Sequence, residues 1–145
     1  MHTCCQERNA VFGYRLKNSE VNREIKFRAK CKDNGEWVYG SYIANYNKND
    51  WIVQGGDFFA VDSDTVSQFT GFYDKEGKEI YEGDILHFVS TKVVYVVYYS
   101  IIKCSFIIAC WNIADEIRLR NSWTEVLLYG KVIGNKYDNP ELLEK

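Results

Sequence analysis

Residues 23–32 carry the clearest alternation of apolar and polar side chains in the chain. In the stretch REIKFRAKCK, apolar positions alternate with cationic ones from residue 25 onward. The apolar residues are Ile25, Phe27, Ala29 and Cys31, and the cationic residues are Lys26, Arg28, Lys30 and Lys32. A period of two places successive side chains on opposite faces of a strand. The pattern therefore predicts a half-buried strand with one apolar face and one cationic face.

Further short strands are predicted between segments rich in turn residues. Asp33, Asn34 and Gly35 tolerate positive φ and predict a turn, after which EWVYGSYIANY is expected to be extended. The other strand candidates are WIVQ (51–54), VSQF (66–69), DILHFV (84–89), KVVYVVYYS (92–100), CSFIIACW (104–111) and, as a further candidate, EVLLYGKVIGN (125–135). Pro140 can open one closing helical turn. Short, regularly spaced strands without long helices predict a small antiparallel β-barrel or sandwich.

The stretch FTGFYDKEGKEIYEGDILHF combines glycines with clustered acids. Gly71, Gly77 and Gly83 are expected at structural turns, where a Cβ atom would be unfavourable. The acids are Asp74, Glu76, Glu79, Glu82 and Asp84. Their spacing does not match a calcium-binding EF-hand loop, which needs glycine at position 6 and glutamate at position 12. We interpret these acids as residues that shape chain reversals, and expect no catalytic or metal-binding residue among them.

Length and charge narrow the class of protein. A chain of 145 residues predicts one domain, and an aromatic content of 16% suits a β-protein. Residues 1–32 hold eight bases and three acids, whereas the rest holds ten bases and seventeen acids. Such an uneven charge distribution can favour self-association or binding of a polyanion by the basic end. Because Lys103 interrupts the apolar stretch 93–114, we expect two buried strands there rather than a membrane span.

The cysteines and histidines offer no recognisable metal-binding pattern. Five cysteines lack a Cys-x-x-Cys pair, and the chain has only two histidines. Residues 1–22 contain no apolar core of a secretory signal and are interpreted as a loosely ordered extension. We therefore expect reduced thiols, no cofactor, no membrane partner and a cytoplasmic location.

Four blocks of sequence resemble those of YopX-like phage and prophage proteins, in the same order. They are REIKFRA (23–29), VDSDTVSQFTG (61–71), DKEGKEIYEGDIL (74–86) and VIGNKYDNPELL (132–143). The resemblance covers about residues 23–143, although the 22-residue lead and the AKCK segment depart from it. It implies a single SH3-like β-barrel domain over 23–145, with additional N-terminal strands, encoded by a phage or prophage and located in the bacterial host. No catalytic residue is implied.

The cationic face of residues 26–32 is the main candidate for binding a partner. Same-face side chains on a strand lie roughly 6.6 Å apart, close to the spacing of successive phosphates. Lys26, Arg28, Lys30 and Lys32, with the neighbouring Trp37 and Tyr39, form the candidate set. This face can contact nucleic acid by phosphate binding and stacking, contact an acidic protein, or remain a solvated surface. It can also pair with the acidic part of the same chain.

The expected function is non-enzymatic. Because we recognise no catalytic pattern, we expect an accessory protein that works by protein–protein contact, by self-association or with a phage or host protein. Binding of nucleic acid through Lys26–Lys32 and the nearby aromatics is the alternative. The biological process and the identity of a partner do not follow from the sequence.

Overall fold

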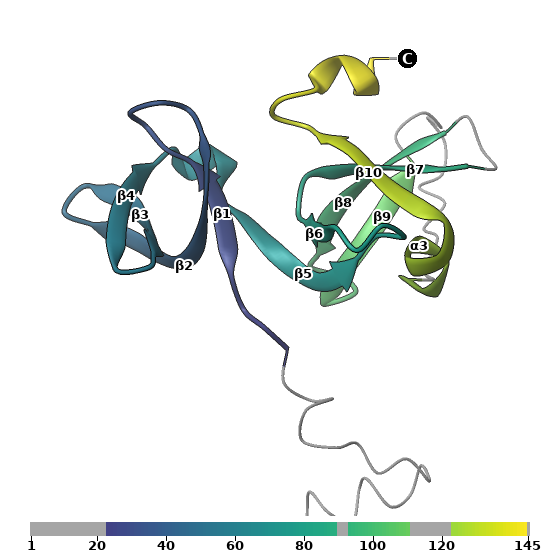
Figure 1. Cartoon of the computed structure of the whole chain (residues 1–145), viewed down its shortest axis with the longest axis horizontal. Coiled ribbons are helices and arrows are strands. Elements are labelled where there is room, and N and C mark those ends of the chain that lie inside the picture. Colours follow the sequence, from purple (N-terminus) through teal and green to yellow (C-terminus); the bar gives the residue numbers. More distant parts are fainter. Residues whose placement is uncertain (1–22, 90–92, 111–122, 145) are drawn as a thin grey trace, which may run out of the picture.

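The computed structural model describes residues 23–89, 93–110 and 123–144, and in these ranges the chain is mainly β-structure (Figure 1). Strand order in the first sheet is β4-β3-β2-β1-β5-β6, and in the second it is β10-β7-β8-β9. All the strand pairs are antiparallel. The first sheet comprises β1 (Phe27–Lys30), β2 (Trp37–Tyr46), β3 (Asn49–Gln54), β4 (Asp57–Val61), β5 (Ser67–Tyr73) and β6 (Glu79–Tyr81). The second comprises β7 (Asp84–Phe88), β8 (Val94–Ser100), β9 (Ser105–Cys110) and β10 (Gly130–Asn135).

Helices are short. The helix α3 (Trp123–Tyr129) leads into β10, and the 3₁₀ turns η1 (Ser63–Thr65) and η2 (Pro140–Leu143) follow β4 and β10. The prediction of a short C-terminal helical turn is therefore confirmed by η2. The predicted strand at 125–135 is correct only in its second half, because the first half forms α3. None of the helices in the described ranges is both long and apolar enough to cross a membrane.

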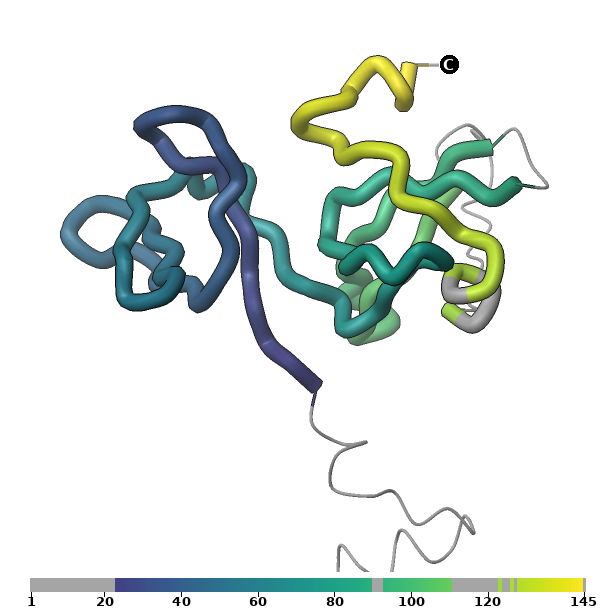
Figure 2. Tube along the Cα trace, viewed as in Figure 1, coloured from purple at the N-terminus to yellow at the C-terminus, as the bar shows by residue number. Residues whose placement is uncertain are grey.

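Two lobes are visible along the Cα trace (Figure 2). We call residues 23–66, which contain β1–β4, the N-terminal lobe, and residues 67–144 the C-terminal lobe. The strand β5 pairs with β1 at Phe27–Gln68 and Arg28–Ser67, so the first sheet continues from one lobe into the other. Beyond Gly83 the chain turns into the second sheet. The mainly β class is confirmed, but the described residues form two sheets and no single closed barrel.

Each lobe has its own apolar core. In the N-terminal lobe, Ala29 and Cys31 of the β1 region pack with Val38, Ile52 and Val61. The last residue of β4, Val61, bridges to Cys31, so the sheet curls until its end meets the strand that began it. The core of the C-terminal lobe contains Ile80, Leu86, Phe88, Tyr95, Val97, Ile108, Cys110, Val126 and Val132. The apolar face of the strand predicted at 23–32 is thus confirmed at Ala29 and Cys31.

Candidate interaction surfaces

The cationic face of β1 is directed at the C-terminal lobe. Arg28 is only 5% exposed, and its Nη2 donates a 2.6 Å hydrogen bond to Oδ1 of Asp84, at the start of β7. The guanidinium carbon lies 4.6 Å from the ring centroid of Trp37 and 4.7 Å from that of Tyr81. Oδ2 of Asp84 accepts a second hydrogen bond, from the Tyr81 backbone N–H at 2.8 Å. Burial raises the pKa of Asp84, and the Arg28 charge opposes that rise.

Two lysines flank this buried pair and also reach the C-terminal lobe. Lys26 forms an ion pair with Glu79 of β6, and Lys30 forms one with Asp138, which follows β10. Asp138 also accepts a 2.7 Å hydrogen bond from Nε1 of Trp37. We call the three pairs Lys26–Glu79, Arg28–Asp84 and Lys30–Asp138 the clasp. Three of the four residues of the predicted cationic face, Lys26, Arg28 and Lys30, thereby join the two lobes.

The clasp alters the acids that take part in it. Burial alone would raise the pKa of Asp138, but hydrogen bonds from Lys30, Trp37 and Asn135 lower it to about 2. Burial likewise favours a higher pKa for Glu79, but Lys26 and the Tyr81 hydroxyl lower it below its ordinary value. Both carboxylates are therefore held in the charged form that their partners require.

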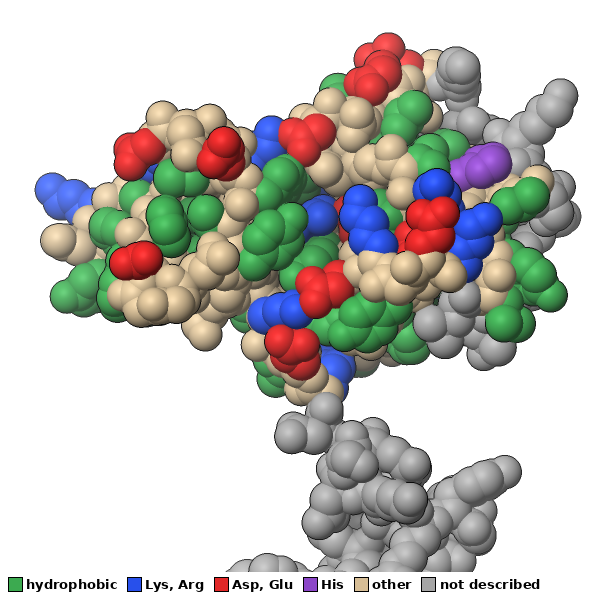
Figure 3. All heavy atoms as spheres, viewed as in Figure 1, with side chains coloured by type: hydrophobic (Ala, Val, Ile, Leu, Met, Phe, Trp, Pro, Cys, Tyr) green, Lys and Arg blue, Asp and Glu red, His purple; other side chains and the backbone are tan. Residues whose placement is uncertain are grey.

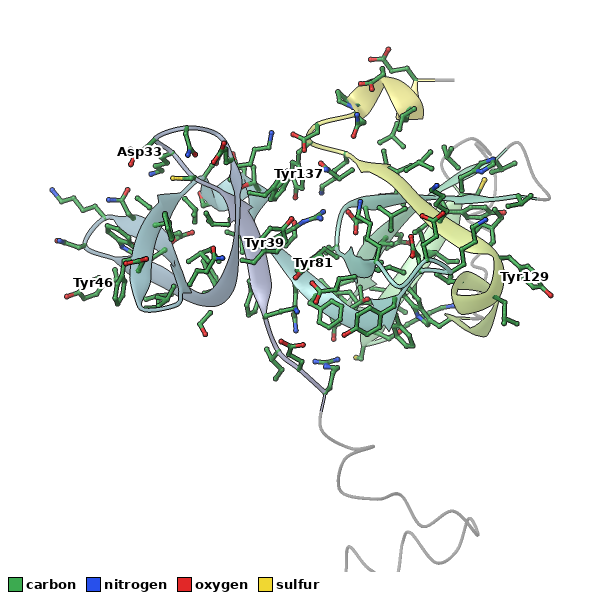
Figure 4. The ribbon with its side chains drawn as sticks, viewed as in Figure 1. Asp33, Tyr39, Tyr46, Tyr81, Tyr129 and Tyr137 are labelled. Atoms are coloured by element: carbon green, nitrogen blue, oxygen red, sulfur yellow. The ribbon has the colours of Figure 1, made fainter. Side chains whose placement is uncertain are left out.

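The remaining candidate residues lie in different surroundings. Lys32 is exposed, and its Nζ donates to Oδ1 of Asn49 at 2.8 Å within the N-terminal lobe. Tyr39 is 39% exposed, with its ring 5.6 Å from that of Tyr81. Figure 4 shows Tyr39 and Tyr81 facing one another between the lobes, with Tyr137 nearby. The structure therefore brings Lys26, Arg28 and Lys30 together, and places Lys32 apart from them.

The glycines expected at turns adopt the left-handed conformation. The φ angles are +86° at Gly71, +81° at Gly77 and +85° at Gly83. Between the first two, Asp74 is 3% exposed and accepts hydrogen bonds from three backbone N–H groups, those of Glu76, Lys78 and Val132. Asp74 therefore holds the turn and also ties it to β10.

A different surface, which the sequence did not indicate, lies on the N-terminal lobe. Cross-strand pairs align Ile43 with Trp51 and Ala60, and Ser41 with Val53 and Phe58. We call these six residues the outer face, because they lie opposite the core-facing Ile52. Phe58 is 60% exposed and Ile43 is 36% exposed. Figure 3 shows hydrophobic side chains gathered on this lobe between charged ones. The strand β4, which supplies Phe58, was not predicted, although its sequence DFFAV is rich in β-forming residues.

Known proteins resemble this chain in sequence and in fold. A family model described as YopX protein matches residues 26–144. The chain belongs to the YopX family. Protein EF1440 from Enterococcus faecalis, whose crystal structure is known, is similar to this YopX-family chain with 26% sequence identity and a TM-score of 0.56. The similarity covers 85% of this chain and 100% of EF1440. No curated protein matches the chain.

The described residues contain no group of three or more histidine, cysteine, aspartate or glutamate side chains placed to hold a metal ion. The clustered acids of residues 74–84 illustrate the reason. Asp74 is occupied by backbone N–H groups, Asp84 by Arg28 and Glu79 by Lys26. Each of these carboxylates is therefore already neutralised or hydrogen-bonded within the fold.

Proposed function

We propose that this YopX-family chain is a non-enzymatic phage or prophage accessory protein that acts by protein–protein contact in the cytoplasm of a bacterial host. The proposal includes self-association through the outer face of β2, β3 and β4. What supports it is the exposure of Phe58 and Ile43 on a sheet face that is apolar except for Ser41. Exposed apolar patches on a folded surface commonly mark interaction sites. The proposal also includes an SH3-like arrangement of the strands, to which the N-terminal strands are an addition.

A second copy is the occupant that best suits this face. Exposed Lys48 lies in the turn before β3, and exposed Asp57 begins β4 just beyond the other end of β3. A two-fold axis perpendicular to β3 would place Lys48 of one copy near Asp57 of the other. The contact would then be self-complementary in both charge and apolar surface, as a two-fold symmetric interface requires.

Sedimentation or light scattering at micromolar concentration tests this proposal. We expect the wild-type chain to self-associate and Phe58→Asp to weaken that association by about tenfold or more, because a buried phenylalanine contributes about 2 kcal/mol. Ile102→Asp is the matched control, since Ile102 is 97% exposed on the turn between β8 and β9. A purely monomeric wild type would contradict self-association. An oligomer that is disrupted by Ile102→Asp and not by Phe58→Asp would exclude the outer face as the surface of self-association.

Nucleic-acid binding by residues 26–32 remains the alternative proposal. The clasp makes it less favourable, because a phosphate would have to compete with Glu79, Asp84 and Asp138 for the same cations. A gel shift that depends strongly on salt would support this alternative. Lys32→Glu is the suitable variant, because Lys32 lies outside the clasp and can be changed without breaking it.

A further inference from the structure

An open groove lies between β5 and the β8–β9 hairpin in the C-terminal lobe. Its volume is about 900 Å³. The described residues that line it include Arg23, Gln68, Phe72, Tyr99, Phe106 and Trp123. Sites for small molecules typically range from about 300 to 1,000 Å³ and combine apolar rings with a few polar groups. The groove lies on a different lobe from the outer face, so ligand binding and self-association can be tested separately.

One wall of the groove is a bulge in β5. Between its two paired positions, four steps along β5 match two steps along β6. Gly71, at the centre of the bulge, has φ +86°, and a Cβ atom there would lie 3.1 Å from Cδ and Cγ of Arg23. The glycine therefore leaves space for the Arg23 side chain to cross β5 and reach the groove. Bulges are frequent where a strand is shaped to direct a side chain at a site.

Two side chains on this wall offer polar groups to a ligand. Arg23 is exposed and Gln68 is half-buried, and no hydrogen bond or ion pair joins either side chain to the described part of the chain. Lys103 also lines the groove, but it already has an interaction partner. The guanidinium of Arg23 can form paired hydrogen bonds with one phosphate or carboxylate. The amide of Gln68 can both donate and accept hydrogen bonds.

Aromatic rings form the rest of the groove. Phe72 stacks on Trp123, with ring centroids 4.3 Å apart and planes inclined by 2°. Tyr99 packs against Phe106 with centroids 5.3 Å apart and planes inclined by 76°. A 3.2 Å hydrogen bond from Nε1 of Trp123 to the Phe106 carbonyl links the two pairs. Phe106 is buried, whereas Tyr99 is 45% exposed and is the ring most accessible to a ligand.

These groups together indicate the chemistry of the ligand. One cation without a partner matches a ligand with a single anionic group, because a nucleic-acid strand or another polyanion is bound by several cations. An accessible tyrosine beside a glutamine amide matches a flat heteroaromatic ring, which can stack on the tyrosine and form hydrogen bonds at its edge. A nucleoside monophosphate carries both features in one molecule.

We propose that this groove binds a free nucleoside monophosphate. Arg23 holds the phosphate through paired hydrogen bonds, and the base stacks on Tyr99. The amide of Gln68 forms hydrogen bonds with the edge of the base. The contacts of Tyr99 with Phe106, and of Phe72 with Trp123, order the aromatic wall before the ligand binds, which lowers the entropic cost of binding.

Isothermal titration calorimetry of the full-length chain with AMP tests the proposal. We expect saturable binding of AMP. Adenosine, which lacks the phosphate, and ribose 5-phosphate, which lacks the base, should each bind weaker by about tenfold or more. Arg23→Glu should weaken AMP binding by a similar factor and leave adenosine binding unchanged. Lys32→Glu makes the same charge change outside the groove and is the matched control, expected to bind AMP as the wild type does.

Two more variants test the contacts with the base. Tyr99→Ala should weaken the binding of AMP and of adenosine alike by about tenfold, because both stack through the same base. Tyr46→Ala, which removes a 65% exposed tyrosine from the other lobe, is the matched control and should change neither. Gln68→Leu keeps the approximate size of the side chain but loses its amide, and should weaken AMP binding by about fivefold.

The position of the ligand is tested by the indole N–H signals in a nitrogen–hydrogen correlation spectrum. We expect AMP to shift the Trp123 signal, assigned with Trp123→Phe, in a saturable way. The Trp51 signal should stay in place, because its indole N–H is bonded to the Tyr46 carbonyl in the N-terminal lobe. A shift of the Trp51 signal without a shift of the Trp123 signal would overturn the proposal.

Several other outcomes would also overturn it. They are absence of saturable AMP binding up to millimolar concentration, an AMP affinity unaffected by Arg23→Glu, and binding of inorganic phosphate as tight as that of AMP. Tighter, Arg23-dependent binding of a single-stranded oligoadenylate would assign the groove to nucleic acid instead. We expect Phe58→Asp to lose self-association and to keep AMP binding, so failure of one proposal is distinguishable from failure of the other.

Discussion

At the scale of single residues, burial decides the role of each acid in the segment 74–84. Asp74 and Asp84 are 3% and 1% exposed, and both accept backbone hydrogen bonds. Glu76 is exposed and pairs with Lys131 at 3.1 Å on the surface. A sequence pattern shows all these residues as acids near glycine. Only the fold distinguishes those that hold the chain from those that face water.

Replacing Asp74 by asparagine should destabilise the protein by about 2–3 kcal/mol, because one buried acceptor oxygen becomes an NH₂ group facing backbone N–H donors. Urea unfolding monitored by circular dichroism measures this loss. Glu76→Gln, in the same turn, is the control and should cost less than about 1 kcal/mol, as surface ion pairs generally do. Equal losses in the two variants would contradict the structural role that we assign to Asp74.

The candidate site was predictable at this scale only in part. The period of two correctly placed Arg28 and its neighbouring lysines on the face opposite Ala29. Its partner was not predictable, because Asp84 lies 56 positions further along the chain and lacks any local signal. Charge asymmetry between residues 1–32 and the rest suggested intramolecular pairing as one of several outcomes. Arg23 was counted only as a charge, since its proximity to Gly71 depends on the bulge in β5.

At the scale of elements, turn residues and alternation predicted most of the strands in the described ranges. Three elements were wrong or missed: the first half of the strand predicted at 125–135, the strand β4 and the short strand β6 (Glu79–Tyr81). Val126 packs into the core of the C-terminal lobe from α3, and its apolar neighbours are compatible with either a helix or a strand. The strand β4 was missed because DFFAV places phenylalanines on both faces, at Phe58 and Phe59, and so lacks a clear alternation.

The pairing of β2 with β3 depends on a glycine that is not among the predicted turn residues. Gly40 has φ +154°, and a Cβ atom there would lie 2.0 Å from the carbonyl oxygen of Val53. Gly40→Ala should therefore cost about 2–4 kcal/mol, because two backbones must separate. Thermal unfolding measures the loss. Gly35→Ala is the control, since Gly35 has φ +72° and open space around it, and should cost only about 1 kcal/mol from strain.

At the scale of the whole molecule, the clasp is the main polar connection between the lobes. Its central pair is buried between Trp37 and Tyr81, whereas the outer pairs remain partly exposed. Buried pairs contribute little net free energy compared with apolar residues, but removal of one partner is costly because the other charge stays buried. The clasp therefore specifies how the lobes meet more than it stabilises them.

Acid should weaken the outer pairs of the clasp, Lys26–Glu79 and Lys30–Asp138. The pKa values of Asp138, Glu79 and Asp74 are lowered on folding. A carboxyl group whose pKa is lowered on folding stabilises the fold at pH values above its pKa in the unfolded chain. This stabilisation is lost as the pH falls through its pKa in the folded protein. For Asp138, the loss lies between its ordinary 3.8 and about 2. We expect the melting temperature to fall as the pH is lowered from 3.8 to about 2.

Asp138→Asn separates the contribution of the outer pair. Its melting temperature should be about 2–4 °C below the wild-type value at neutral pH, as expected for about 1 kcal/mol in a chain of this size. The difference should narrow toward pH 2, where wild-type Asp138 is also protonated. Glu141→Gln, an exposed change in the same C-terminal segment, is the control. A difference that is independent of pH would show that the charge of Asp138 is unimportant.

The shared strand β1 has a consequence for any attempt to divide this protein into fragments. Its residue Arg28 pairs through the backbone with Tyr39 on one side and Ser67 on the other. A fragment ending near Val66 would lose the second neighbour and leave a buried guanidinium without Asp84. The complementary fragment would expose the edge of β5. Neither piece should remain folded and monomeric, so the chain is best expressed, crystallised and mutated whole.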